Sequence, residues 1–559
     1  MALSLHGLRP KIAAAAVVKG AAWRAGRLPG GRRAVAGLAG RIDPGGEATD
    51  SYRGMLAQLL YDTTEDTTGS DPVYDPVAGL IPGTASRLPE AEALAEAAWA
   101  QPSAGRHIAA AAAYRKPYRA DFESAALHYE HAYRLNPEDL RSVEGIISTG
   151  VRTHFDFTRI WRYAAALRPR TGALASPALW EPIGALFLRR PSRETLQRAV
   201  HALEARGDDL AGLHQLLLEV LSVRLQFLGQ FRCAFWLREL MARNRVAELR
   251  GIPLESALWF KHLLGAYAYL KDTEQLNRAA AKPRLAIISP RVQLQVEKLQ
   301  ADVALFTGDI QPLLAHAAAR REQLPLPQDE IMAELVNGRR IAVVGPAATE
   351  DELGRVIDSY DVVVRTRRLA APTRAQAARI GTRTDIAYYS GRDLLKDYDD
   401  AATAAASGHL KLAVTRPFYY EALETVPDWL RCARFEFGLY FRGAPMGIQR
   451  IVYDLLQFDP QEIGIFHADF YAGAHAAAEG YRSGYGVFGP HRETNDVVMM
   501  HDLGYEFRCM QRLVAAGPVV AHGTADQVLS LYPEQYITRL ETDSVLARPA
   551  DWLEEPPRQ

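Results

Sequence analysis

Cysteine is scarce in this sequence, which contains only Cys233, Cys432 and Cys509 among 559 residues. The three lie far apart and form neither a Cys-x-x-Cys pair nor a cysteine and histidine spacing that binds zinc. A disulfide framework and a cysteine metal centre are therefore excluded. We expect three buried thiols in a reducing compartment, and no metal site.

Long apolar runs are also missing, since no uninterrupted run approaches the roughly 18 residues that cross a bilayer. Charge is balanced, with 65 basic against 66 acidic residues, so no global field attracts nucleic acid. Hydrophobic residues make up 48% of the chain, which is typical of a globular protein, and a length of 559 residues predicts two or three domains. We expect a cytoplasmic protein without a nucleic-acid partner.

Acidic residues are absent from residues 1–42, so all the charged side chains of this segment are basic. No clear cleavage signature follows, so a secretory signal is not expected. Two interpretations of this segment stay open: a disordered basic arm, or an arm that makes a peripheral contact with the inner face of the membrane. Residues 43–119 are rich in Gly, Pro, Asp and Thr, which predicts a linker with local helix.

Apolar residues recur at helical intervals in residues 120–328. The segment Ala125 to Pro137 is similar to the second helix of a tetratricopeptide repeat, but the later helices keep no fixed period. We therefore predict an all-α, helical-repeat-like N-terminal domain of irregular helical hairpins. Such an array offers a surface to a protein partner and carries no chemistry of its own.

Short apolar runs alternate with helical segments in residues 339–540, ahead of a tail of residues 541–559. This alternation predicts an α/β C-terminal domain, a Rossmann-like parallel sheet with helices on both faces. The predicted strands are Ile341 to Gly345, Asp361 to Arg365, Asp385 to Tyr389, Leu412 to Thr415 and Glu462 to His467. The predicted helices are Glu350 to Ile357, Arg374 to Ile380, Arg392 to Ala406 and Gly447 to Phe458.

Small or polar residues follow the first three predicted strands, at the edge where ligands of parallel sheets bind. The first strand leads into a predicted capping box, Thr349 to Glu352, and helix starts favour anions. The second strand ends in arginines, which suit phosphate or carboxylate, although solvated surface arginines would look the same. The candidate ligand-binding residues are Gly345, Pro346, Ala347, Arg365, Thr366, Arg367, Tyr389 and Ser390.

His501 stands directly before a predicted helix that Asp502 can cap. The helix start opposes a positive imidazolium, so it favours a neutral ring that accepts a proton. His501 is therefore a candidate general base. An isolated histidine before a helix is more often structural, so this assignment needs support from other segments.

Three segments together resemble the sialyltransferase family, family 29 of the glycosyltransferases. Its large motif is similar to IAVVGPAATEDELGRVIDSYDVVVRTRR from Ile341 to Arg368, followed by GTRTDIAYY from Gly381 to Tyr389. Its small motif is similar to the segment from Ala444 to Tyr471. Its very small motif, a histidine followed five residues later by glutamate, matches His501 and Glu506. The order and spacing of all three agree with the family.

The resemblance implies a metal-independent, inverting transfer from a CMP-sugar donor, without a cofactor. It implies that His501 deprotonates the acceptor hydroxyl and that Glu506 supports the site. The nucleotide sugar would be held by the loops after the first strands, by Asp469 and by the turn Pro445, Met446 and Gly447. We expect a bacterial-type enzyme that moves a nonulosonic or related keto-sugar acid to a surface glycan.

Two departures from the family keep alternatives open. Pro346 and Arg367 stand where the family usually has asparagines that help to hold the nucleotide. A transferase of the same fold with another nucleotide sugar is one alternative, and a non-catalytic adaptor with a degenerate transferase domain is the other. The segment Asp397 to Asp400 mimics a metal-binding DxD, but it falls in a predicted helix, so we expect an exposed acidic face there.

Overall fold

The computed structural model describes residues 88–547 with several gaps, and contacts divide this part of the chain into two units. The helical unit comprises residues 88–224 and 236–296, and the α/β unit comprises residues 225–235 and 297–547. The predicted basic arm 1–42, residues 43–87 of the predicted linker, Ser390, Pro445 and residues 548–559 lie outside the described residues. The internal gaps are 116–120, 154–156, 189–190, 250–256, 282–289, 324, 327, 369–371, 390–392, 416–425, 434–445, 476 and 479–500.

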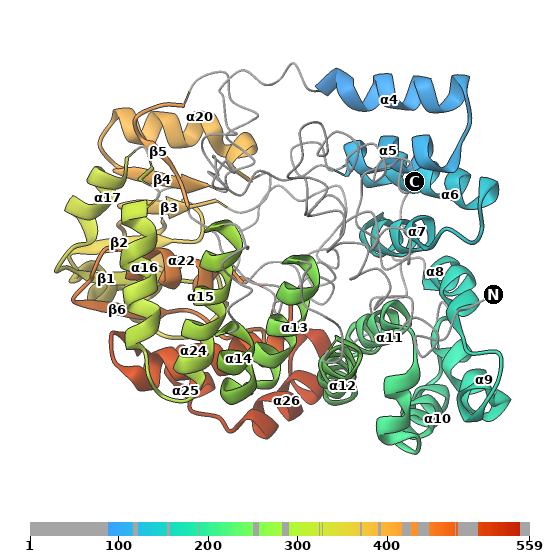
Figure 1. Cartoon of the computed structure of the whole chain (residues 1–559). Coiled ribbons are helices and arrows are strands. Elements are labelled where there is room, and N and C mark those ends of the chain that lie inside the picture. Colours follow the sequence, from blue (N-terminus) through green and yellow to red (C-terminus); the bar gives the residue numbers. More distant parts are fainter. Residues whose placement is uncertain are drawn as a thin grey trace. The chain divides into compact units, whose positions relative to one another are not determined.

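Helices alone make up the described helical unit, as the sequence predicts (Figure 1). They are α4 (Leu88–Ala100), α5 (Ala104–Tyr114), α6 (Phe122–Leu135), α7 (Leu140–Thr153), α8 (Phe157–Ala164), α9 (Pro177–Leu186), α10 (Arg193–Glu204), α13 (Ala257–Leu270) and α14 (Thr273–Ala280), with most of α11 (Gln215–Phe227) and α12 (Phe231–Leu249). One core cluster, which begins at Ala91 of α4, joins α4 and α5 to α6, so helical packing begins inside the predicted linker. None of the helices in the described ranges combines the length and apolarity needed to cross a bilayer.

Three histidines meet in the core of the helical unit. His107 on α5 and His128 on α6 are buried, and their Nδ1 atoms lie 2.9 Å apart. His131 stacks on His107, and Trp99 on α4 contacts all three imidazole rings. Burial lowers the pKa of His107 and lowers that of His128 to about 4. The contact between the two Nδ1 atoms needs one donor and one acceptor, so it exists only while a ring stays neutral.

We predict that mild acid loosens this histidine core. Because the pKa of His128 is lower in the folded than in the unfolded chain, the unfolded chain binds more protons between pH 6.5 and about pH 4. The stability that this group contributes is complete above that window and is lost as the pH falls through it, up to roughly 3 kcal/mol. Hydrogen exchange of residues 104–135, corrected for intrinsic rates, should show less protection at about pH 5 than at about pH 7. The variant His128→Leu should reduce the difference, and equal protection of the native core at both pH values would contradict the prediction.

A seven-stranded, fully parallel sheet forms the centre of the α/β unit, in the order β5-β4-β3-β2-β1-β6-β7. The strands are β1 (Arg340–Val344), β2 (Val362–Arg365), β3 (Ile386–Tyr388), β4 (Leu412–Thr415), β5 (Leu430–Cys432), β6 (Glu462–Phe466) and β7 (Val519–Ala521). All five predicted strands are confirmed within a residue at either end. The sequence analysis missed β5 and β7, which are three residues each and too short to show a periodic pattern.

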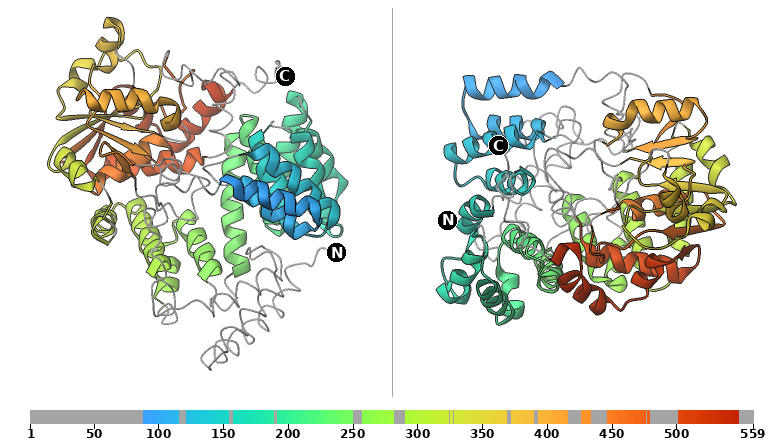
Figure 2. Two further views of the ribbon diagram at one scale, coloured as in Figure 1. Left: turned by 90° about the horizontal axis from the view of Figure 1, so that it is seen from above. Right: turned by 180° about the vertical axis from the view of Figure 1, so that it is seen from behind.

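Helices cover both faces of this sheet, as predicted (Figure 2). They are α15 (Pro290–Phe306, in large part), α16 (Gln311–Gln323), α17 (Asp329–Val336), α18 (Gly354–Asp358), α19 (Arg374–Ile380), α20 (Asp393–Ala406), α22 (Gly447–Leu456), α24 (Leu503–Ala516), α25 (Thr524–Leu529) and α26 (Pro533–Thr542). Ala387 on β3 packs in one cluster with Leu394 of α20, whereas the neighbouring Tyr388 bonds to Asp454 of α22. Successive strand residues point to opposite faces, so α20 and α22 lie on opposite sides of the sheet.

The described chain continues beyond the predicted boundary at residue 540. The Val545 amide donates to the Gly473 carbonyl at 2.8 Å, and Leu546 is fully buried. Residues 541–547 therefore belong to the α/β unit and not to the predicted tail.

The fully buried carboxylate of Asp454 fixes α22 to the sheet. It accepts hydrogen bonds from the Tyr388 hydroxyl of β3 at 2.6 Å and from Arg431 of β5 at 2.7 Å. Gln457 donates to the same carboxylate, and Arg431 also pairs with Asp329 of α17 at 2.9 Å. Every member of this network has a partner, which is the condition under which a buried ion pair is tolerated.

We predict that Asp454→Ala destabilises the α/β unit by about 3–5 kcal/mol, because it leaves the buried Arg431 guanidinium and the Tyr388 hydroxyl without their shared acceptor. Thermal unfolding followed by circular dichroism would measure the loss. Asp399→Ala is the matched control, since Asp399 is an exposed aspartate on α20, and its unfolding temperature should stay near that of the native chain. Equal unfolding temperatures for the two variants would contradict the prediction.

Candidate functional site

His501 lies directly before α24 and its ring faces a buried carboxylate. Asp502 caps the helix as predicted, because its Oδ1 accepts the Tyr505 amide at 3.0 Å. The Nδ1 atom of His501 is 3.2 Å from Glu506 Oε1, and the two side chains are 17% and 1% exposed. Among the described residues, the Nε2 atom of His501 has no hydrogen-bond partner. The imidazole is thus held at one nitrogen and free at the other.

Glu506 joins the starts of two helices. Its second oxygen, Oε2, accepts the backbone N–H of Met446 at 2.5 Å, and Met446 directly precedes α22. A carboxylate accepts but does not donate, so His501 must carry its hydrogen on Nδ1 to bond to Glu506. This tautomer leaves a lone pair on Nε2, and a general base needs such a lone pair to accept a proton.

Thr366 lies beside the same helix start. It follows β2, and a β-carbon placed on Gly447 would lie 3.5 Å from its Cγ2 atom. The Thr366 hydroxyl oxygen is buried and has no hydrogen-bond partner among the described residues. The structure therefore links Thr366, Met446 and Gly447 to the pair of His501 and Glu506.

A segment far away in the sequence completes the support of His501. The last residues of α11 belong to the α/β unit, and Gln226 Nε2 in this last turn of the helix donates to the His501 carbonyl at 3.1 Å. Phe235 packs so closely against Gly504 that a β-carbon there would lie 2.8 Å from its ring. The sequence analysis missed Gln226, because a contact across 275 positions leaves no local pattern.

The loop after β1 binds to the end of β6 rather than leaving its amides free. The Gly345 amide donates to the Phe466 carbonyl at 2.8 Å, and the Ala347 amide donates to the His467 carbonyl at 3.0 Å. A β-carbon on Gly345 would lie 2.4 Å from the His467 oxygen, so this strand contact alone requires glycine. The Pro346 carbonyl accepts the Ala478 amide. Ligand binding by Gly345, Pro346 and Ala347 stays a prediction that these contacts do not favour.

The capping box predicted at Thr349 to Glu352 is wrong. Helix α18 begins only at Gly354, and its N-cap residue, Leu353, has no side-chain cap. The Thr349 hydroxyl instead lies 2.6 Å from Nδ1 of the buried His467, and Asp351 accepts the Thr524 amide. The Thr349 hydroxyl and the Asp351 carboxylate thus bond to residues distant in the sequence instead of capping a helix.

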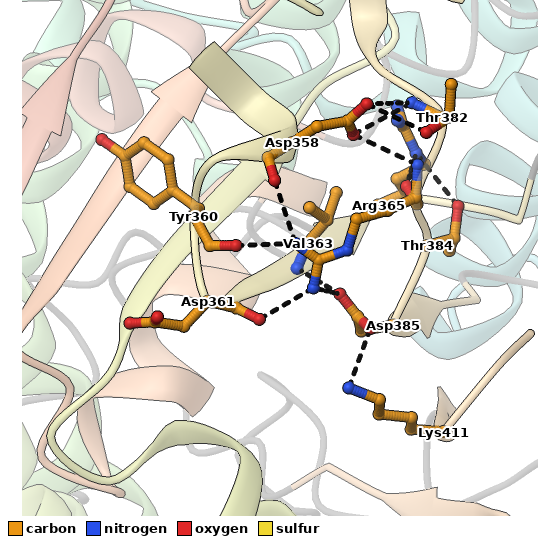
Figure 3. A network of polar contacts seen from close by, with 10 residues as sticks. Asp358, Tyr360, Asp361, Val363, Arg365, Thr382, Thr384, Asp385 and Lys411 are labelled. Atoms are coloured by element: carbon orange, nitrogen blue, oxygen red, sulfur yellow. Dashed lines mark hydrogen bonds and ion pairs between the residues drawn. The ribbon is translucent and has the colours of Figure 1, made fainter. Parts of the chain in front are cut away.

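Arg365 is buried, and its guanidinium donates hydrogen bonds to the loop that precedes β3. Its Nε donates to the Arg383 carbonyl and the Thr384 hydroxyl, both at 3.0 Å, and its Nη2 donates to the Ile380 carbonyl. Figure 3 shows the polar network around this loop, in which Asp385 accepts the Val363 amide and pairs with Lys411. These contacts give Arg365 a structural role, and its predicted contact with a nucleotide stays untested.

Arg367 and Tyr389 lie on the α20 side of the sheet, opposite to α22. Arg367 pairs with Asp397, and Tyr389 packs in one cluster with Leu394 of α20. The predicted site residues therefore divide between the two faces, with Thr366, Met446 and Gly447 on the His501 side. Asp397 lies inside α20 as expected, but it is paired and largely buried rather than solvated.

Asp469 follows β6 and stabilises the turn there. Its Oδ1 accepts the Tyr471 amide at 3.0 Å, and burial raises the pKa of its carboxyl. The next residue, Phe470, accepts the Tyr536 hydroxyl, and Tyr536 stacks on Phe507 of α24. Within the described ranges, no group of three His, Cys, Asp or Glu side chains is arranged to hold a metal ion.

Comparison with known proteins assigns no family to this chain, because no protein-family model and no curated protein matches it. The geometry around His501 is therefore the basis on which a function can be proposed.

Proposed function

We propose that the α/β unit is a sialyltransferase-like, Rossmann-type, metal-independent inverting glycosyltransferase. It would transfer a nonulosonic or related keto-sugar acid from a CMP-sugar to a surface glycan, with His501 as the general base. The observation that supports this most is the hydrogen-bonded set of His501, Glu506 and the Met446 amide. It gives a partly exposed imidazole a fixed tautomer, and no described residue binds the other nitrogen, Nε2.

The proposed reaction begins with the acceptor hydroxyl, which is a poor nucleophile until it loses its proton. His501 Nε2 would take that proton as the hydroxyl oxygen bonds to the anomeric carbon of the sugar and the bond from that carbon to the phosphate oxygen breaks, which releases CMP. Glu506 would stabilise the imidazolium through Nδ1. A general base acts efficiently only when its ring is held in the reactive orientation. The Gln226 contact with the His501 backbone would help to hold the ring in place. Thr366, whose hydroxyl has no partner among the described residues, is the side chain that we propose as a hydrogen-bond donor to the ligand.

We predict that His501→Ala lowers the release of CMP from a CMP-linked nonulosonic acid by about 100- to 10,000-fold, because the reaction loses its base. The full chain is assayed with and without an added glycan acceptor, and folding is checked by circular dichroism. His409→Ala is the matched control, since His409 lies at the exposed end of α20, and it should release CMP at the native rate.

Several outcomes would redirect or overturn this proposal. If folded His501→Ala released CMP at the rate of the native chain, the assignment of His501 as the general base would be wrong. Hydrolysis of a uridine- or guanosine-linked sugar instead would support the transferase with another donor. Binding of CMP-sugar or of a protein partner without any turnover would support the adaptor.

We also predict a graded effect at Glu506. Glu506→Gln keeps an oxygen for the Met446 amide but removes the charge that faces His501, so we expect kcat to fall about 10- to 100-fold with KM little changed. Glu506→Ala removes both contacts, and we expect a larger loss with faster hydrogen exchange at the start of α22. Equal activity of the two variants and the native chain would contradict a supporting role for Glu506.

A further inference from the structure

A cleft lies within the helical unit, between α8 and α9 (Figure 1). Its volume is about 700 Å³, which is within the range of sites that hold a small molecule. The larger side chains that line it are Trp161, Trp180, Arg168, Arg170 and Glu181, and the rest of the wall is alanine, glycine and proline. Aromatic walls with a few charged groups are typical of a ligand-binding site.

Both tryptophan rings of this cleft are fixed by contacts within the helical unit. Trp180 is 5% exposed, and its Nε1 donates to the Leu174 carbonyl at 2.6 Å. Trp161 stacks on Phe187, with ring centroids 4.3 Å apart, and remains partly exposed. The centroids of the two indole rings lie 6.2 Å apart. Because these rings are already ordered, a ligand that packs on them costs little side-chain entropy.

Arg168 lies over both tryptophans and is held there. Its guanidinium carbon is 6.0 Å from the ring centroid of Trp161 and 5.8 Å from that of Trp180. Its Nε donates to the Ala165 carbonyl at 3.0 Å, whereas neither Nη atom has a hydrogen-bond partner among the described residues. A guanidinium that a carbonyl and two rings hold in this way can present its planar fork to a carboxylate.

The charge of the lining favours an anion with a single negative group. Two arginines and one glutamate line the cleft, which leaves one net positive charge. Arg170 and Glu181 are exposed, and neither side chain has a hydrogen-bond partner in the part of the chain that the structure describes. A polyanion would be repelled by the Glu181 carboxylate. A monoanion with hydroxyl groups finds both a cation and an acceptor for its hydroxyl hydrogens.

We propose that this cleft binds a carboxylated sugar residue of a glycan. Arg168 would pair with the sugar carboxylate through its two Nη atoms, and the exposed part of the Trp161 ring would pack against the apolar C–H groups of the sugar. Glu181 would accept hydrogen bonds from the sugar hydroxyls, and Arg170 would donate to them. A peptide fits less well, because peptides bind along a sheet edge or a long apolar groove, and this cleft has the size of a small-molecule site.

The choice of a sugar acid rests on the proposed function, since the product of that transfer carries a sugar carboxylate. The acceptor glycan would then already contain sugar acids, and the helical unit would hold one of them. Binding in the cleft itself does not depend on His501, which belongs to the α/β unit. Glycan binding and CMP release can therefore succeed or fail independently.

The test is a calorimetric titration of the full chain with sialyllactose, which carries one sugar carboxylate, and with lactose, which carries none. We expect sialyllactose to bind at least about tenfold more tightly than lactose. Arg168→Gln should weaken sialyllactose binding by at least about tenfold, and Arg168→Lys, which keeps the charge but not the fork, should weaken it several-fold. Arg162→Gln is the matched control, because Arg162 is exposed on α8 and is not part of the lining, and its affinity should stay near the native value.

Three results would overturn the proposal. They are an absence of saturable sialyllactose binding by the native chain, equal affinities of Arg168→Gln and Arg162→Gln, and tighter Arg168-dependent binding of a short peptide of glutamates. Circular dichroism checks the folding of each variant, and should Arg168→Gln fail to fold, Arg168→Lys and Arg170→Gln decide the matter. All titrations are repeated in His501→Ala, where Arg168-dependent binding should persist even though CMP release is lost.

Discussion

The buried carboxylate of Asp454 is the contact on which the arrangement of the α/β unit depends. It holds β3 through Tyr388, β5 through Arg431 and, by way of Arg431, α17 through Asp329. Because Asp454 belongs to α22, the same carboxylate determines where that helix begins above the sheet. Met446 directly precedes the helix and its amide binds Glu506, so a network in the core is connected to the imidazole at the edge.

Alternation of side chains along the strands divides this edge into two polar regions. On the α22 side, Thr366 and the helix start lie beside His501 and Glu506. On the α20 side, Arg367 pairs with Asp397 and Tyr389 packs in one cluster with Leu394. The proposed base therefore shares one face of this edge with Thr366, and α20 holds the predicted residues of the other face.

Regular patterns in the sequence predicted the elements that regular packing forms. The strand Leu412–Thr415 and the helix Arg374–Ile380 occur with the predicted bounds, and Asp502 caps α24 as expected. The misses occur where distant partners decide the structure. Thr349 bonds to His467 instead of capping a helix, and Gln226 reaches His501 from another part of the chain.

The proposed function requires that this sheet edge binds a cytidine nucleotide next to His501. Calorimetric titration of the intact chain with CMP, UMP and GMP tests that claim most directly, because binding precedes any turnover. We expect saturable binding of CMP, with UMP and GMP weaker by at least about tenfold. We also expect weaker CMP binding by Thr366→Val, which removes the hydroxyl but keeps the shape of the side chain. Absence of saturable binding by any of the three nucleotides would contradict it.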